Sequence, residues 1–306
     1  MSEATAAIEV AGLRKSFGHQ VALDGLDLRV ETGQIAGFLG PNGSGKSTTL
    51  RILLGMLRAE ATTIRVLGAD PWKDAVTVHR RIAYVPGDVN LWPNLTGGEA
   101  IDILSTLRGG VNTARRDDLL RRFDLDPTKK ARAYSRGNRQ KVALVAALAS
   151  DAELLILDEP TSGLDPIVKA AFATCIREYK AEGRSVLLSS HIFADVEQLC
   201  DTVTIIRKGK TVESGTLAEM RHLRRTTISV VLGSAGADLS RIAGVNDLVM
   251  NGPHATFTVG DGDLAGVLAE LATLRPSALV SSPPTLEELF LRHYSAETFT
   301  AMASAS

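Results

Sequence analysis

The first part of the chain alternates between hydrophobic and charged positions. Leu26, Leu28 and Val30 are separated by charged residues, and this period of two predicts a half-buried strand. Ile8 and Val10 begin an earlier strand of the same kind. The chain therefore starts with β structure.

The middle of the chain changes to apolar runs and helical spacing. Short apolar runs predict strands at 35–39, 154–157, 186–188 and 203–206. Apolar residues three and four positions apart predict helices at 46–57, 119–123, 138–149 and 168–181. A further helix is expected after Thr96, where Glu99 follows at the spacing of a capping box. Strands that alternate with helices indicate an α/β fold with a parallel sheet covered on both faces.

The pattern changes again after about residue 215. Strands are expected at 227–232 and 255–259, a helix at 264–274, and a short helix containing Leu286, Leu289 and Phe290 after two prolines. We therefore expect three parts. They are a first domain over 5–220, a small C-terminal α+β domain over 221–295 and a flexible tail over 296–306.

Composition narrows the class of protein. The chain has 306 residues, 44% of them hydrophobic and 23% charged, with a formal net charge of −1. This balance is typical of a globular protein and disfavours nucleic-acid binding through bulk positive charge. Two cysteines, Cys175 and Cys200, cannot form a disulfide framework and fit a reducing compartment. With no secretory signal expected, and with Val142–Ala149 too short to span a bilayer, we expect a cytoplasmic protein or one held at a membrane by a partner.

A glycine-rich run lies between a predicted strand and a predicted helix. It matches the P-loop pattern G-x-x-x-x-G-K-[ST], in which backbone N–H groups surround phosphates, the lysine contacts them and the hydroxyl binds Mg²⁺. The sequence therefore predicts ATP and Mg²⁺ as cofactors, with Ser47 as a metal ligand. The expected nucleotide-binding residues here are Gly40, Pro41, Asn42, Gly43, Ser44, Gly45, Lys46, Ser47 and Thr48.

A second motif ends an apolar strand in two carboxylates. Asp158 and Glu159 follow residues 154–157, and the carboxyl end of a parallel strand is where α/β folds bind ligands. We expect Asp158 to hold Mg²⁺ and Glu159 to act as general base towards the attacking water. Without a P-loop, the pair is better explained as a solvated strand end.

Four further features specify the family. Tyr134–Gln140 resembles the signature motif of ATP-binding cassette (ABC) ATPases, and Pro160–Pro166 resembles their D-loop. His191 matches their switch histidine, and Phe17 occupies the place of the aromatic residue that stacks on adenine. The motifs follow in the family's order, and the resemblance covers about residues 5–220.

The resemblance implies the fold and the remaining site. It implies a P-loop NTPase core with an antiparallel β subdomain and a helical subdomain at about 92–150. It also implies a homodimer that sandwiches two nucleotides, with Ser135, Gly137 and Asp165 contacting the partner's ATP and His191 acting catalytically. Taken alone, Ser135 is better explained as a helix cap, His191 as a packing residue and Phe17 as a core residue.

Two places depart from the family pattern. Gly87 stands where a glutamine is usual, after a strand at 82–86, with Asp88 or water as candidate substitutes. The signature carries Arg136 for glycine and Asn138 for glutamine. We keep Ser135 and Gly137 as expected ligands and assign no role to Arg136.

The cassette followed by a small domain resembles the ATPase subunits of bacterial ABC-2-type exporters, including the daunorubicin-resistance type. This implies a separate ABC-2-type permease as partner and a peripheral position on the cytoplasmic face of the plasma membrane. No nucleic-acid partner is expected. Two alternatives remain: a non-transport ABC ATPase acting on nucleic acid or ribosomes, and a regulatory ATP-binding module with little turnover.

Overall fold

The chain folds into two compact units, Met1–Gly215 and Thr216–Ser306. The computed structural model describes residues 6–106, 110, 112–222, 226–232, 239–260 and 262–282. Each unit has its own hydrophobic core and is considered by itself.

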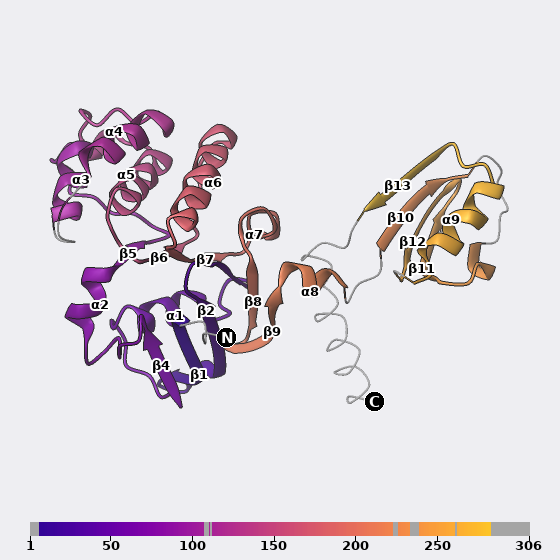
Figure 1. The fold of residues 1–306 in the computed structure, drawn as a ribbon, viewed down its shortest axis with the longest axis horizontal. Helices are drawn as coiled ribbons and strands as arrows, with labels where there is room; N and C mark the ends of the chain where they lie inside the picture. Colours follow the sequence, from indigo (N-terminus) through magenta and orange to yellow (C-terminus); the bar gives the residue numbers. More distant parts are fainter. Residues whose placement is uncertain are drawn as a thin grey trace. The chain divides into compact units, whose positions relative to one another are not determined.

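A parallel sheet forms the centre of the first unit (Figure 1). In spatial order its strands are β5 (Ile82–Val85), β6 (Leu154–Asp158), β7 (Ser185–Ser190), β3 (Ile35–Leu39), β8 (Thr202–Arg207) and β9 (Lys210–Thr216). The pairs from β5 to β8 are parallel. Every residue of β3, β6 and β7 is buried, as expected for strands covered on both faces. Because parallel strands end at the same edge, the segments after β3, β6 and β7 are brought together there.

A smaller antiparallel sheet contains the alternating segments of the N-terminal part. Its order is β2 (Gln20–Glu31), β1 (Ala6–Phe17) and β4 (Thr63–Val66). The predicted inward positions Leu26, Leu28 and Val30 are all buried, which confirms the period-two interpretation. The strand β4 was not predicted, because only Val66 of its four residues is buried.

Helices cover the parallel sheet and form a group of their own. They are α1 (Lys46–Leu53), α2 (Ala75–Arg81), α3 (Gly97–Thr106), α4 (Thr113–Arg122), α5 (Arg136–Leu148), α6 (Pro166–Ala181) and α7 (Phe193–Leu199), with a 3₁₀ turn η1 (Ala131–Ala133). Both α3 and α4 pack against α5 (Figure 1). The predicted capping box is confirmed: the Thr96 N–H donates to Glu99 Oε2 at 2.7 Å, and the Glu99 N–H donates to Thr96 Oγ1 at 3.2 Å.

Two helix boundaries differ from those predicted. Helix α1 ends at Leu53 rather than at residue 57, because Gly55 adopts φ 65° and its backbone packs closely on the Pro71 carbonyl. Helix α5 begins at Arg136 rather than at Asn138, because Ser135 is its N-cap. Gly137 therefore lies within the first turn of α5 and does not precede the helix, as the sequence had suggested.

The second unit is a four-stranded antiparallel sheet with one helix packed on it. Its elements are α8 (Leu217–His222), β10 (Thr226–Val231), η2 (Leu239–Arg241), β11 (Val245–Asn251), β12 (His254–Val259), α9 (Leu264–Thr273) and β13 (Ala278–Ser282). The spatial order of the strands is β11-β12-β10-β13. Phe257, Val267 and Leu271 are fully buried between sheet and helix.

The sequence pattern predicted only β10, β12 and α9 among the described elements of this unit. The edge strands β11 and β13 escaped it because neither contains a buried residue, so neither shows a hydrophobic period. The expected helix at 286–290 and the tail at 296–306 lie outside the described residues. No helix in the part of the chain that the structure describes is long and apolar enough to cross a membrane.

Candidate functional site

The glycine-rich run forms a tight loop between β3 and α1. A Cβ on Gly40 would lie 2.4 Å from the Ile206 carbonyl oxygen, and Gly45 adopts φ 111° as the N-cap of α1. A side chain is therefore excluded at both ends of the loop. Because Gly45 has no side chain to cap the helix, the first N–H groups of α1 are left for an anion.

Two side chains of the loop face inward. The Lys46 residue is 5% exposed, and its Nζ donates to the Gly40 carbonyl at 2.6 Å and to the Pro41 carbonyl at 3.2 Å. Burial lowers the pKa of Lys46, and the nearby Glu159 and Asp158 carboxylates oppose that shift. The Ser44 hydroxyl is buried without a hydrogen-bond partner among the described residues. A buried ammonium group and an unsatisfied hydroxyl in one loop fit a phosphate group.

Asp158 lies at the end of β6, opposite the start of α1. Its Oδ2 accepts a hydrogen bond from Ser47 Oγ at 3.1 Å, and its Oδ1 accepts one from Ser189 Oγ. The residue is 8% exposed. Burial, reinforced by Asp158, raises the pKa of the adjacent Tyr84 to about 12. The Ser47 hydroxyl and the Asp158 carboxylate therefore lie next to each other.

Glu159 and His191 lie next to this carboxylate. Glu159 adopts φ 48°, an uncommon conformation for a residue with a side chain, and its N–H donates to the Ser189 carbonyl at 3.1 Å. Its Oε1 lies 2.9 Å from His191 Nδ1. Both side chains remain partly exposed, at 26% and 44%. The structure therefore brings the predicted base and the predicted histidine into direct contact.

One hollow joins the P-loop and Glu159 to the end of the β1–β2 hairpin. Phe17 is 49% exposed, so it is not a core residue, and Lys15 Nζ lies 5.2 Å from the centre of its ring. Three of the lining residues, Gln20, Val21 and Ala22, were not predicted from the sequence, because no motif marks them. The lining residues are Phe17, Gln20, Val21, Ala22, Asn42, Gly43, Gly45, Lys46, Ser47, Thr48 and Glu159.

Three predicted residues lie elsewhere. Ser135, Gly137 and Asp165 neither line this hollow nor, unlike Asp158 and His191, hydrogen-bond to a described residue that lines it. Ser135 Oγ caps α5 by accepting from the Asn138 N–H at 3.2 Å. Asp165 Oδ1 caps α6 by accepting from the Val168 N–H at 3.0 Å, and this backbone hydrogen bond lowers the pKa of Asp165. The predicted site is therefore divided into two parts within one chain.

In the second part of the predicted site, Gly137 and Gly163 pack closely against each other. A Cβ on Gly137 would lie 2.6 Å from the Gly163 carbonyl oxygen, and Gly163 itself adopts φ 77°. The loop after β6 thus rests directly on the first turn of α5.

Replacing Gly137 with alanine is expected to displace this loop and to lower ATP hydrolysis by roughly tenfold or more, because neither backbone can yield without moving the other. The measurement is steady-state phosphate release. Gly266→Ala on α9 is the matched control, since nothing lies within 4 Å of its added Cβ. Wild-type turnover of the Gly137→Ala protein would contradict the expectation.

The residues that depart from the family pattern lie within the described part of the chain. A Cβ on Gly87 would lie 3.2 Å from the backbone carbonyl oxygen of Asp158 and 3.8 Å from its carboxylate carbon, so this position is next to Asp158 but has no side chain to extend to it. Asp88 and Arg136 are both exposed.

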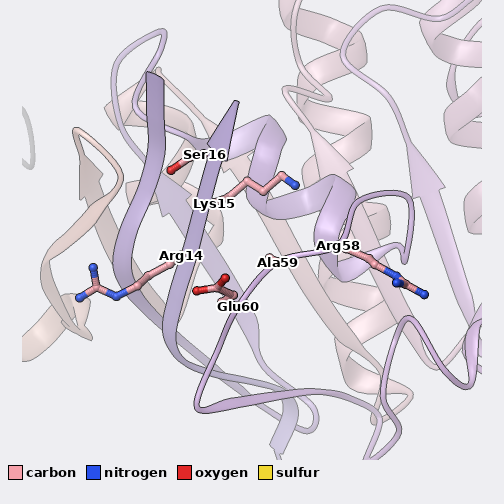
Figure 2. Close-up of a pocket in the computed structure, with 6 residues that line it drawn as sticks. All are labelled: Arg14, Lys15, Ser16, Arg58, Ala59 and Glu60. Carbon is pink, nitrogen blue, oxygen red and sulfur yellow. The ribbon is translucent and has the colours of Figure 1, made fainter. Parts of the chain in front are cut away.

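A further hollow lies beside β1 and the segment after α1 (Figure 2). Its cations diverge: Arg14 pairs with Asp24, and the Arg58 guanidinium lies 4.6 Å from the centre of the Trp72 ring. In Figure 2 the Arg14 and Arg58 side chains point to opposite sides of Glu60. No reactive set converges there, so the P-loop hollow is the candidate site.

Comparison with known proteins gives consistent results. The family model described as ABC transporter matches residues 23–162. The daunorubicin resistance ATP-binding protein DrrA3 of Streptomyces coeruleorubidus is 36% identical over 302 residues, covering 94% of this chain and 96% of the relative. The bacitracin transport ATP-binding protein BcrA of Enterococcus faecalis is 30% identical over 263 residues, covering 84% and 82%.

Solved structures agree on the fold of the first unit. An ATP-binding subunit of an ABC transporter has 31% identity and a TM-score of 0.67, covering 71% of this chain and 92% of that one. The dimeric bacterial ABC transporter cassette MJ0796, at 22% identity and a TM-score of 0.61, covers 69% of this chain and 98% of its own, and supports the fold alone.

Proposed function

This chain belongs to the ABC transporter family and is an ATP-binding subunit with ATPase activity, and we propose that it powers export through a separate ABC-2-type permease. One observation carries the catalytic part of the proposal. The P-loop, Asp158, Glu159 and His191 converge at the carboxyl edge of one parallel sheet.

ATP binding is assigned to the P-loop and the β1–β2 hairpin. Backbone N–H groups of the loop and the start of α1 would surround the phosphates, with Ser44 and Lys46 contacting them. Lys46 Nζ would then exchange the Gly40 and Pro41 carbonyls for phosphate oxygens. The exposed ring of Phe17 at the other end of the hollow suits stacking on adenine.

Mg²⁺ fits the Ser47–Asp158 pair. Mg²⁺ prefers oxygen ligands and uses one or two protein groups together with phosphate and water oxygens. No cluster of three or more His, Cys, Asp or Glu suited to a metal occurs among the described residues, and this agrees with a site completed by the nucleotide. The ion would supply charge neutralisation at the phosphates.

Hydrolysis is assigned to Glu159 and His191. Glu159 would accept the proton of the attacking water, since its carboxylate lines the hollow beside Lys46. The contact between His191 Nδ1 and Glu159 Oε1 would orient that carboxylate and place the imidazole beside the γ-phosphate.

A homodimer would complete the site. Ser135, Gly137 and Asp165 lie outside the P-loop hollow, and Ser135 begins a helix whose first N–H groups suit a phosphate. In a two-fold dimer each copy would present these residues to the nucleotide of the other. Ile167, 81% exposed beside Asp165, is an apolar residue that such an interface would cover.

The export assignment is supported by the relatives' names, which refer to daunorubicin resistance, Nod factor export and bacitracin transport. We therefore place this subunit in a multidrug-type exporter, at the cytoplasmic face of the membrane through its permease.

Purification of the intact complex from membranes tests the proposal. We expect an ABC-2-type permease to accompany the chain and phosphate release to rise several-fold in the reconstituted complex. Steeply salt-dependent nucleic-acid binding without a permease would favour the non-transport alternative. No phosphate release under either condition would favour the regulatory module.

A further inference from the structure

Two segments at the carboxyl edge of the sheet run side by side. One follows β6 and contains Glu159, and the other follows β7 and contains His191. They are joined first by the Glu159 N–H, which donates to the Ser189 carbonyl at 3.1 Å, and then by the contact of 2.9 Å between His191 Nδ1 and Glu159 Oε1.

A further contact joins the same segments away from the nucleotide hollow. Thr161 Oγ1 donates a hydrogen bond to Asp195 Oδ2 on α7. Thr161 is 5% exposed, and the Asp195 side chain is 14% exposed. Lys169 Nζ on α6 lies 3.8 Å from Asp195 Oδ1, so the carboxylate is partnered on both oxygens. Neither Thr161 nor Asp195 is among the described residues lining the P-loop hollow.

The segment held by this contact continues to the second part of the site. Two residues after Thr161, the Gly163 carbonyl rests on Gly137 of α5, and Asp165 then caps α6. The position of the Gly163 backbone is therefore bounded by Gly137 on one side and by the Thr161–Asp195 hydrogen bond on the other.

We propose that Thr161 and Asp195 are positioning residues for ATP hydrolysis, and that their hydrogen bond couples the His191 segment to the loop resting on Gly137. A displacement of His191 moves the start of α7, and Asp195 transmits it to Thr161 and hence to Gly163. In this way the γ-phosphate site of one chain sets the positions of Ser135, Gly137 and Asp165, the residues that this chain presents to its partner's nucleotide. The inference rests on the roles proposed above for Glu159, His191 and Gly137.

The chain contains a matched contact for comparison. Lys180 Nζ on α6 lies 2.5 Å from Asp201 Oδ1, just beyond the end of α7. This ion pair joins α6 to the chain after α7, whereas the Lys169–Asp195 pair joins α6 to the first turn of α7. It lies at the opposite end of these helices and, among the described residues, contacts neither Glu159 nor Gly163, so its loss tests a purely structural tie.

The experiment measures kcat and KM for ATP in the full chain. Thr161→Val removes the hydroxyl at nearly constant volume, and we expect kcat to fall roughly 5- to 30-fold with KM for ATP within about twofold. Thr161→Ser, which keeps the donor, and Asp195→Asn, which keeps an acceptor, should retain most of the turnover. The double variant Thr161→Val/Asp195→Leu should lose no more than either single variant. Lys180→Met should leave kcat unchanged.

The outcomes separate this inference from the assigned function. Normal turnover of Thr161→Val, combined with loss of turnover in Glu159→Gln, would overturn only the coupling. Equal loss in Thr161→Val and Lys180→Met would reduce the contact to ordinary structural support. If Thr161→Val does not fold, Asp195→Leu against Asp195→Asn gives the same comparison. Normal turnover of Glu159→Gln would remove the assigned function itself.

Discussion

Replacing Lys46 with alanine is expected to weaken ATP binding by roughly 10- to 100-fold. The ammonium group is buried and donates to the Gly40 and Pro41 carbonyls. Alanine removes the charge that would contact the β- and γ-phosphates and leaves both carbonyls without this donor. The loss is larger than for an exposed ion pair because the group is desolvated.

A nucleotide titration with the purified protein measures this effect. Lys73→Ala is the matched control, because the Lys73 side chain is 79% exposed and interacts only with Asp70 at 3.9 Å in the described structure. We expect its ATP affinity to equal that of the wild type. Unchanged affinity in Lys46→Ala would contradict the assignment of the P-loop as the phosphate site.

The site at the carboxyl edge of the parallel sheet could be predicted because the strands leading to it have the clearest hydrophobic pattern. β3, β6 and β7 are buried on both faces, so they are continuous apolar runs, and each is followed by a polar motif. Parallel pairing then requires the three motifs to meet. This is why Lys46 and Glu159, distant in sequence, could be assigned to one site from the strand pattern, whereas His191 was assigned only by its resemblance to the family's switch histidine.

Side-chain contacts across the site were not predictable. The left-handed conformation of Glu159 and the hydrogen bond from Thr161 to Asp195 depend on how β6 and β7 pair, and no local pattern encodes that register. The same holds for Gly163 against Gly137, which requires the helical part to fold back on the loop after β6. Edge strands such as β11 and β13 escaped prediction because they bury no residue.

Gly87 has a structural consequence for the proposed Mg²⁺ site. Its backbone packs near Asp158, where a Cβ would lie 3.8 Å from the carboxylate carbon. A glutamine at this place would therefore come close to the Ser47–Asp158 pair, and glycine leaves that volume to other ligands, such as water. The absence of a side chain here makes Asp158 and Ser47 the protein groups on which the proposed Mg²⁺ site depends.

Replacing Glu159 with glutamine is expected to reduce turnover by about 100- to 10,000-fold while leaving ATP affinity nearly unchanged. Glutamine has the same size and can still contact His191, but it cannot accept a proton from water. Because hydrolysis would normally reopen the nucleotide sandwich, the variant should accumulate as a long-lived ATP-bound dimer.

Single-turnover phosphate release and sedimentation with and without ATP measure both effects in the Glu159→Gln protein. Glu153→Gln is the matched control at the opposite end of β6, where the carboxylate pairs with Arg81 on the surface, and it should retain turnover. Normal hydrolysis by Glu159→Gln would show that another group accepts the proton. If instead the variant bound ATP without hydrolysing it and stayed monomeric, the proposed contact of Ser135 and Gly137 with the partner's nucleotide would be contradicted. The two measurements therefore test the base and the shared site separately, because proton transfer depends on Glu159 and dimer closure depends on the residues that α5 presents.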